Sequence, residues 1–489
     1  MVFTSFDFIF FLPISFFLYW LIFNRISVRT SNLFLIAISY IFYGWCNWKL
    51  CLLLFAISLT TYLAGQAIYH FDYGQPEIAK RNKRLVKTIN IATIIVCIGV
   101  LGVFKYSDFF IQSVASVLNQ VGFMVSMPTL NLILPLGISF YVFQSLTYTI
   151  DIYQGKFTPP HGKKSDIIDY LAFMSFFPQL LSGPIGRASR LLPQYSVKRD
   201  FNYDFAIKGC WQILWGLFMK VCVADRLSTY VDTIYDNLSM HNGTSVVVAA
   251  IFYSIQIYCD FAGYSLMAIG CGKLFGIKLD ENFRQPYFAN SIPDFWRRWH
   301  ISLSTWFRDY VYIPLGGNRV KEWRVYFNLF ITFLVSGLWH GAAWSFVIWG
   351  MLHGVYQICG KLWNKYVIRR NESRSNIINI AFTFALVTIA WVFFRITDIS
   401  VAIDAIAMMF TSYGSPFIDL TVMVYGTVSI ILLFIVDFIS FRYSSLLESV
   451  NNNKNIVVVS LKYFVAIALV IWIVCAGVFS SGQFIYFKF

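Results

Sequence analysis

The stretch Phe295-Trp296-Arg297-Arg298-Trp299-His300, which runs on to Gly316-Gly317-Asn318-Arg319, is the most informative part of the sequence. A second stretch, Ser336-Gly337-Leu338-Trp339-His340-Gly341, follows it. In both stretches a histidine directly follows a tryptophan and lies among apolar residues. Imidazole titrates near neutral pH, so such a histidine can accept a proton from a hydroxyl group. The pair of stretches predicts proton chemistry at a site buried within a membrane.

The composition indicates an integral membrane protein. Of the 489 residues, 58% are hydrophobic and 19% are aromatic, while only 13% are charged. An ordinary soluble domain has about 25% charged residues. The mean hydropathy is +0.64. A soluble domain could not bury this much apolar surface, so we predict an all-α polytopic membrane protein that forms one domain over residues 1–489.

The apolar segments set the expected number of spans. A membrane-crossing helix needs about 20 mostly apolar residues, and by this measure we predict about eleven or twelve spans. They lie near 6–23, 32–46, 51–68, 89–104, 131–150, 206–225, 244–271, 325–339, 342–360, 376–394, 420–440 and 456–480.

The net charge of +14 reflects 38 basic and 24 acidic residues. The basic residues are distributed over several short loops, which is typical of cytoplasmic loops and not of a nucleic-acid-binding domain. Placing the loops 80–87, 156–164 and 361–374 in the cytoplasm puts the N-terminus outside. The nine cysteines include no CxxC pair, so we expect no disulfide framework and no sulfur-based metal site.

Two segments do not have the pattern of simple spans. Residues 176–187 are apolar but contain two prolines and two glycines. Such irregular backbone persists at membrane depth only inside protein or beside a water-filled cavity. We therefore predict a re-entrant loop that lines a cavity, with a cytoplasmic surface loop as the alternative. In 287–319, arginines interrupt the aromatic residues, so this segment lies at the cytoplasmic interface or packs inside the protein.

The charged residues in and near these segments are candidates for substrate binding. Arg297, Arg298, Arg308 and Arg319 match phosphate oxygens of an acyl carrier. The alternative is topological anchoring together with salt bridges to Asp294 and Asp309. Asp260 lies inside an apolar span, where an acid usually faces a cavity or a partner. Further candidates for substrate contact in the two histidine stretches are Trp296, Trp299, Asn318 and Trp339.

Several other chemistries lack their sequence signature. The chain has no HExxH pair and no acidic cluster suited to a metal ion. It has no GxSxG elbow for a serine nucleophile and no Walker motif for ATP. On position alone, His340 is either a functional group or a buried histidine hydrogen-bonded to a carbonyl. For His353 we expect a role in packing or hydrogen bonding.

The two histidine stretches, together with Tyr258-Cys259-Asp260-Phe261-Ala262-Gly263-Tyr264-Ser265, resemble the membrane-bound O-acyltransferase (MBOAT) superfamily. The similarity is greatest with its bacterial branch, which O-acetylates cell-surface polysaccharides such as alginate. Leu266 departs from that pattern, because the branch usually has a second acid at this position.

The resemblance implies helices around a central channel in the bacterial cytoplasmic membrane. It implies that His340 is the general base, and that His300 binds a substrate or shapes the channel. The expected donor is a cytoplasmic thioester, with acetyl-CoA favoured and no bound cofactor. The expected acceptor is an extracytoplasmic polysaccharide or an acetylesterase-like partner transferase. The alternatives are D-alanyl transfer from a carrier-protein thioester, transfer to a lipid or protein hydroxyl, and a transporter without bond-making chemistry.

Overall fold

The computed structural model describes the chain except for residues 46, 74–75, 159–165, 367–376, 446–448, 451–452, 454, 480–484 and 486–489. The described residues form helices and no strands. The predicted basic loops at 156–164 and 361–374 lie partly outside the described residues. The chain divides into two compact units, one of Met1–Ile213 with Met267–Asp280 and the other of Leu214–Leu266 with Glu281–Phe489. The prediction of one domain over 1–489 stays a prediction, and each unit is described by itself.

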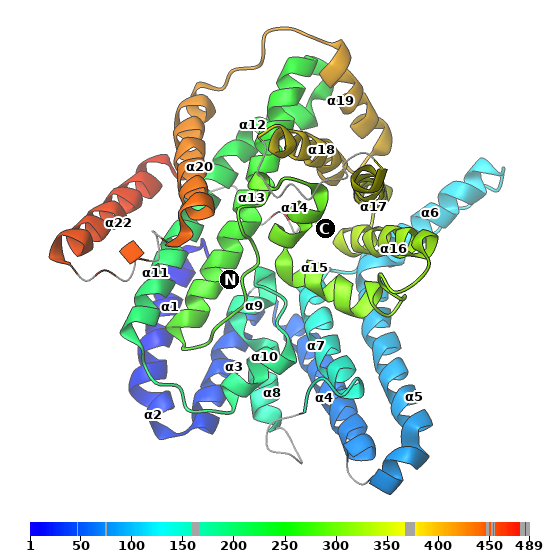
Figure 1. The fold of residues 1–489 in the computed structure, drawn as a ribbon, viewed down its shortest axis with the longest axis vertical. Helices are drawn as coiled ribbons and strands as arrows, with labels where there is room; N and C mark the ends of the chain where they lie inside the picture. The colour runs from blue at the N-terminus through cyan, green and yellow to red at the C-terminus, as the bar shows by residue number, and fades with distance from the viewer. Residues whose placement is uncertain are drawn as a thin grey trace. The chain divides into compact units, whose positions relative to one another are not determined.

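The first unit is a set of helices from the N-terminal part of the chain (Figure 1). They are α1 (Phe6–Leu18), α2 (Asn24–Ile26), α3 (Val28–Gly44), α4 (Lys49–Tyr73), α5 (Pro76–Leu101), α6 (Ser107–Gln120), α7 (Ile138–Tyr153), α8 (Ile167–Ser175), α9 (Phe177–Ser182) and α10 (Ala188–Tyr195). The unit boundary falls within α11 (Tyr203–Phe218) and within α13 (Gly243–Leu274).

The second unit carries both histidine stretches. Its helices are α12 (Asp225–Asp236), α14 (Ile292–Arg298), α15 (Ile301–Phe307), α16 (Glu322–His340), α17 (Trp344–Tyr366), α18 (Ile377–Arg395), α19 (Ile399–Thr411), α20 (Thr427–Arg442) and α22 (Ile456–Ala476).

Eight helical segments among the described residues are long and apolar enough to cross a membrane. The other four predicted spans coincide with α3 and α7, which have 17 and 16 residues, and with α16 and α17, which carry more polar side chains. The multi-pass helical class is confirmed, while the larger number of spans stays a prediction. The eight segments are Phe6–Ile26, Lys49–Phe71, Asn82–Gln120, Tyr203–Asp236, Gly243–Leu274, Ile377–Arg395, Val422–Arg442 and Ile456–Ala476.

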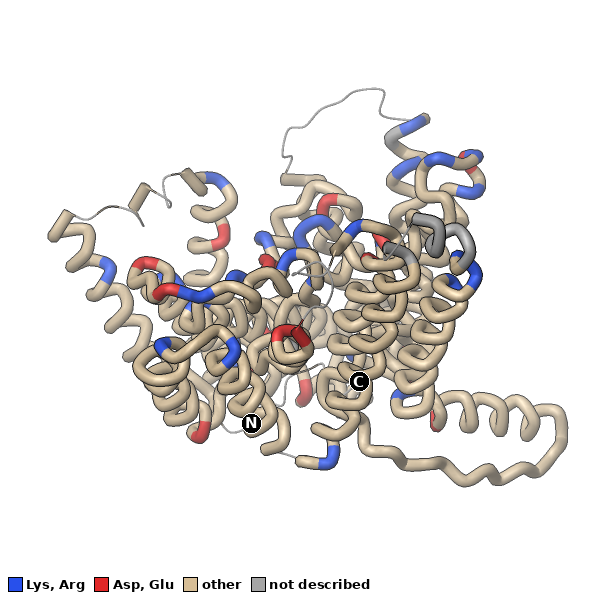
Figure 2. Tube along the Cα trace, turned by 90° about the horizontal axis from the view of Figure 1, so that it is seen from below, with Lys and Arg blue, Asp and Glu red and all other residues tan. Residues whose placement is uncertain are grey.

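Charged residues lie mainly at helix ends and in connecting segments (Figure 2). Long stretches of helix between them carry no charge (Figure 2). This arrangement suits helices whose middle turns lie in hydrocarbon, because a charged side chain there is costly.

The irregular segment 176–187 lies inside the first unit. Phe176 and Phe177 are fully buried, and the backbone N–H of Phe177 donates to Ser39 Oγ over 3.0 Å. Gly137, with φ of +75°, allows the backbone of this segment to approach α7. A Cβ atom at Gly137 would lie 2.0 Å from the carbonyl oxygen of Leu180. Protein therefore surrounds this backbone, and the surface-loop alternative is wrong. The lining of a cavity stays a prediction.

The segment 287–319 packs inside the second unit over its first part, where Phe295, Trp299 and Phe307 are buried, while Asn318 and Arg319 at its end are exposed. Ser291 caps α14 through its hydroxyl, which accepts from the backbone N–H of Asp294 over 3.3 Å. The apolar face of α14 buries Phe295 and Trp296. Arg297 and Arg298 occupy the last turn, where positive charge is favourable to the helix dipole.

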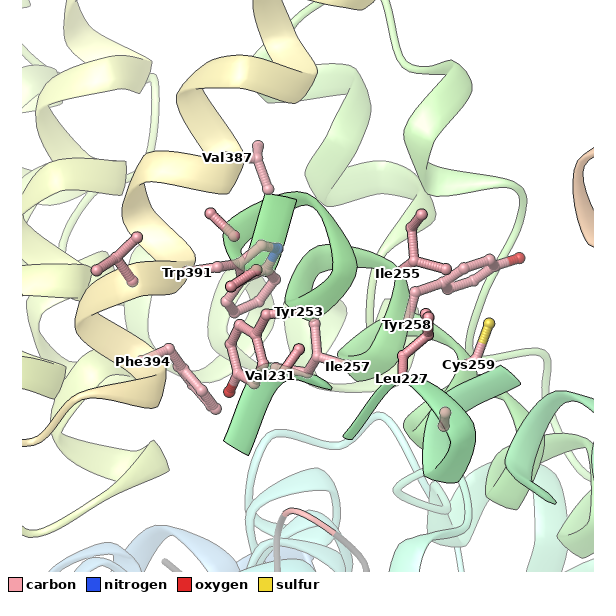
Figure 3. Close-up of a cluster of buried hydrophobic side chains, with 14 of the residues drawn as sticks. Leu227, Val231, Tyr253, Ile255, Ile257, Tyr258, Cys259, Val387, Trp391 and Phe394 are labelled. Atoms are coloured by element: carbon pink, nitrogen blue, oxygen red, sulfur yellow. The ribbon is translucent and has the colours of Figure 1, made fainter. Parts of the chain in front are cut away.

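Aromatic and aliphatic side chains fill the core of the second unit (Figure 3). Trp391 and Phe394 on α18 lie beside Tyr253 of α13 and Val231 of α12 (Figure 3). Trp391 and Phe394 are fully buried. This core forms the apolar support for the histidines described below.

The helices α16 and α17 lie side by side and are joined by a short turn (Figure 1). Two glycines face one another where they approach. A Cβ atom added at Gly337 would lie 2.3 Å from the carbonyl oxygen of Phe346 and 3.1 Å from Cα of Gly350. A Cβ atom at Gly350 would lie 2.5 Å from the carbonyl oxygen of Phe333. Because these neighbours are backbone atoms, a side chain at either position forces the helices apart.

A buried ion cluster also stabilises the second unit. Lys220 Nζ lies 2.7 Å from Asp225 Oδ1 and 2.6 Å from Asp260 Oδ1. The other carboxylate oxygen of Asp260 accepts from the backbone N–H of Ile485 over 2.7 Å. These three charged side chains are at most 8% exposed, so each needs its partner within the protein.

We expect Gly337→Ala to destabilise the protein by about 1–3 kcal/mol, because it overpacks the contact between α16 and α17. The matched control is Gly360→Ala on α17, since a Cβ atom there has no heavy atom within 4 Å. Thermal unfolding in detergent measures both variants. Equal melting temperatures for the two variants would contradict the close helix contact.

We expect Lys220→Met to cost about 3–5 kcal/mol of stability, because two buried carboxylates then lose their cation. The control is Lys278→Met at an exposed position. The same thermal unfolding measurement applies, and a wild-type melting temperature for Lys220→Met would show that the cluster does not stabilise the fold.

Candidate active site

His340 is the last residue of α16 and is 2% exposed. The helix ends here because Gly341 adopts an extended conformation, and a Cβ atom at Gly341 would lie 2.1 Å from the ring of Phe346. The His340 ring packs against Trp339 and Trp349, each with a centroid distance of 4.9 Å. The sequence thus places an ionisable ring at the end of a helix, where aromatic rings surround it.

His300 lies between α14 and α15 and is fully buried. Its φ of +44° is in the left-handed region, which few residues other than glycine adopt. The tight turn that results directs the chain from one short helix into the next. The His300 ring packs edge-on against Phe261 of α13, with centroids 4.6 Å apart.

The structure brings the two predicted histidines together. Their ring centroids lie 6.5 Å apart, although 40 positions separate them in sequence. Trp339 contacts both rings, with centroid distances of 4.9 Å to His340 and 6.0 Å to His300. The two imidazoles therefore lie close together among aromatic rings.

Asn282 holds His300 through a side-chain contact that the sequence analysis did not identify. Its Oδ1 lies 3.1 Å from His300 Nδ1, and its Nδ2 donates to Ser265 Oγ over 3.1 Å. The carbonyl oxygen of Asn282 accepts from the backbone N–H of Ile301 over 2.9 Å. The contact joins residues on opposite sides of a loop, so no helical or strand spacing indicates it. Burial lowers the pKa of His300 to about 3, which keeps its ring neutral at physiological pH.

Trp296 and Trp299 are part of the aromatic packing beneath the histidines. The indole N–H of Trp296 donates to Nδ1 of His353 over 3.2 Å, which confirms the predicted hydrogen-bonding role of His353. The ring of Trp299 lies 5.0 Å from that of Trp391 and is fully buried. The substrate contacts predicted for Trp296, Trp299 and Trp339 stay predictions.

Two of the predicted arginines form the salt bridges that the sequence analysis gave as the alternative. Arg298 Nε lies 3.0 Å from Asp294 Oδ1, and Arg308 Nε lies 2.7 Å from Asp309 Oδ1. Arg297 is exposed. Phosphate binding by these arginines and by the exposed Arg319 stays a prediction.

Asn318 belongs to an exposed polar group and not to the buried histidine pair. Its Oδ1 accepts from the hydroxyl of Tyr312 over 2.6 Å and from Lys361 Nζ over 3.2 Å. The preceding Gly316 and Gly317 have φ of +110° and +54°, so the chain makes a tight turn just before Asn318. A substrate contact of Asn318 stays a prediction.

Asp260 lies next to Phe261, whose ring packs on His300. Its carboxylate is bound by Lys220, so it faces a partner, one of the two predicted environments. The ion pair fixes the turn of α13 that carries Phe261. Direct substrate binding by Asp260 stays a prediction. Among the described residues, no group of three or more His, Cys, Asp or Glu side chains is placed to hold a metal ion.

The chain is similar to several acyltransferases. The protein named "Probable alginate O-acetylase AlgI" from Pseudomonas putida is 38% identical over 417 residues, which cover 85% of this chain and 81% of the relative. A peptidoglycan O-acetyltransferase from Helicobacter pylori is 36% identical over 77% of this chain and 73% of its own length. A teichoic acid D-alanyltransferase from Bacillus subtilis is 30% identical over 55% of this chain and 70% of its own length.

The family model of the membrane-bound O-acyltransferases matches residues 41–397. This match includes His300 and His340, and also Phe261, Trp339 and Trp349, which pack against the two rings. It also covers most of the chain, and the first two relatives cover more still. The chain therefore belongs to the MBOAT, membrane-bound O-acyltransferase, family.

Proposed function

We propose that the protein passes an acetyl group from a cytoplasmic thioester across the membrane to a hydroxyl group on the other side. The observation that carries the proposal is the buried pair of histidine rings, 6.5 Å apart, in a membrane O-acyltransferase. The acceptor is an extracytoplasmic polysaccharide, or a partner transferase that completes the delivery. The protein then works as a multi-pass protein of the bacterial cytoplasmic membrane.

His340 acts as the general base in this proposal. Its imidazole takes the proton of the attacking hydroxyl while the hydroxyl oxygen forms a bond to the thioester carbonyl carbon. The carbon–sulfur bond then breaks, and the imidazolium returns the proton to the leaving thiolate. The products are an oxygen ester and a free thiol. His340 is 2% exposed, so water has little access to the thioester during the transfer.

His300 supports the reaction from the opposite side of the reacting group. Its ring is fully buried and its lowered pKa keeps it neutral, so it suits hydrogen bonding to a substrate better than proton transfer. The side chains of Trp296, Trp299 and Trp339 complete the apolar wall. Asp260 stabilises α13 behind Phe261 and acts at a distance from the reacting atoms.

Acetyl-CoA is the proposed donor. Two relatives named for O-acetyl transfer match 85% and 77% of this chain, whereas the teichoic acid D-alanyltransferase matches 55%. The phosphates of the donor would contact basic residues of the segment 287–319. Arg297 and Arg319 are exposed there, and Arg308 is exposed beside its partner Asp309.

We expect His340→Ala to reduce acetyl transfer by about a hundredfold or more, because general-base catalysis contributes about 10²–10⁴ in rate. The measurement is ester-linked acetate on each envelope polysaccharide at matched membrane levels of the protein. The matched control is His70→Ala at an exposed position of the first unit, which should leave acetylation unchanged. Unchanged acetate on every polymer in His340→Ala would remove His340 as the base.

We also expect purified protein to consume acetyl-CoA only when a hydroxyl acceptor is present, and to release one free thiol for each ester formed. Radiolabelled acetyl-CoA with a soluble saccharide acceptor measures both quantities. Label that crosses a vesicle membrane without forming an ester would indicate a transporter. Activity with a D-alanyl carrier thioester but not with acetyl-CoA would indicate the other donor class.

A further inference from the structure

The orientation of the Asn282 side chain is fixed by its neighbours. The backbone N–H of Ser302, which can only donate, points to Oδ1 of Asn282 over 3.3 Å. The hydroxyl of Ser302 donates to the same oxygen over 2.8 Å. On the other side, Nδ2 donates to Ser265 Oγ over 3.1 Å. The atom that faces His300 is therefore the amide oxygen, which can only accept a hydrogen bond.

This orientation decides which ring nitrogen of His300 carries the proton. The amide oxygen of Asn282 lies 3.1 Å from Nδ1 of His300, so Nδ1 must be the donor. In a neutral imidazole with the proton on Nδ1, the lone pair of the ring is on Nε2. Asn282 is 1% exposed and His300 is 0% exposed, so water does not compete for this contact.

We propose that Asn282 is a positioning residue for acyl transfer: it holds His300 as the tautomer protonated at Nδ1, and His300 accepts a hydrogen bond through Nε2 from an acceptor hydroxyl that neighbours the attacking one. This inference rests on the proposed function. It adds a residue that touches neither donor nor acceptor, and it separates the roles of the two histidines. His300 orients the acceptor through this neighbouring hydroxyl, and His340 removes the proton of the attacking hydroxyl.

An uncharged partner suits this division of roles. A carboxylate beside Nδ1 would stabilise the imidazolium and favour proton uptake by His300, whereas an amide oxygen carries no net charge. Besides His340, the rings beside His300 belong to Phe261, Phe283 and Trp339, which carry no formal charge. The surroundings therefore favour the neutral ring and its role as an acceptor.

The position of Asn282 is itself well defined by the backbone. Its carbonyl oxygen accepts from the N–H of Ile301, and the N–H of Arg284 donates to the carbonyl oxygen of Arg298, each over 2.9 Å. These two bonds align the segment that carries Asn282 with the turn that carries His300. Ser265 extends the network to α13, so three separate parts of the chain hold one imidazole.

The test is the tautomer of His300 in the full-length protein. The chain has six histidines, so labelling their ring nitrogens with ¹⁵N gives a small set of signals, and His300→Gln identifies those of His300. We expect Nδ1 to be protonated and Nε2 to be unprotonated in the wild type. A wild-type His300 that carries its proton on Nε2 would overturn the proposal, whether or not any variant folds.

Asn282→Ala tests the consequence for the reaction. We expect the Nδ1-protonated signature to be lost and acetyl transfer to fall by about tenfold to a hundredfold, with the KM for acetyl-CoA unchanged. The matched control is Asn237→Ala at an exposed asparagine of the same unit. If Asn282 had a purely structural role, the variant would lower transfer without changing the tautomer of His300, and this result would overturn the proposal. A changed tautomer with full transfer would overturn it as well.

Asn282→Asp keeps an oxygen that can accept from Nδ1 of His300, and it removes the NH₂ group that donates to Ser265. A carboxylate still accepts from Nδ1 but favours the imidazolium, so at a pH that keeps His300 neutral the proton should stay on Nδ1 and transfer should exceed that of Asn282→Ala. Transfer equal to that of Asn282→Ala would count against the proposal. The tautomer measurement needs no acyl transfer. A wild-type protein that forms no acetyl ester would therefore reject the proposed function, and the ¹⁵N spectrum would still test the contact between Asn282 and His300.

Discussion

The close approach of α16 and α17 at Gly337 and Gly350 is the contact on which the site depends. With no side chain at either position, the backbones come within the distance at which a Cβ atom would collide with a carbonyl oxygen. The approach sets the position of the turn that follows α16, and hence that of His340. It also brings Trp349 of α17 against the His340 ring. Small residues at a helix contact are a common solution in membranes, where packing and not the hydrophobic effect holds helices together.

Polar side chains in this interior depend on partners from the protein itself. Lys220 binds two carboxylates, and Asn282 uses both ends of its amide group. Such contacts are favourable because an unpaired polar group in an apolar environment costs several kcal/mol, on the order of 2–7. The same contacts have a second effect, since each fixes the direction of a neighbouring ring. Asp260 stabilises the turn that carries Phe261, and Asn282 holds His300, so the polar network and the aromatic packing define one site together.

The arrangement explains how a membrane O-acyltransferase combines a dry site with proton chemistry. In the proposed reaction, the aromatic rings keep water away from the thioester and so protect it from hydrolysis. In the proposed function, His340 can move a proton and His300 can accept a hydrogen bond, and neither ring carries a permanent charge. An acid or a lysine at the same depth would need a counter-ion, as the cluster around Lys220 illustrates. Neutral histidines therefore fit a site that must admit both an acyl donor and a hydroxyl acceptor.

The class of protein, the approximate places of its helices and the two candidate histidines could all be predicted from the sequence. These features depend on composition, on the length of apolar runs and on short motifs, all of which are local. It also predicted the salt bridges of Arg298 and Arg308 as one alternative, because their partners are near in sequence. Only the tertiary structure decided that Asn282 holds His300, that Lys220 binds Asp260, and that Asn318 lies apart on an exposed surface. These contacts follow from the path of the backbone through turns such as the one at His300, and no periodic pattern in the sequence encodes that path.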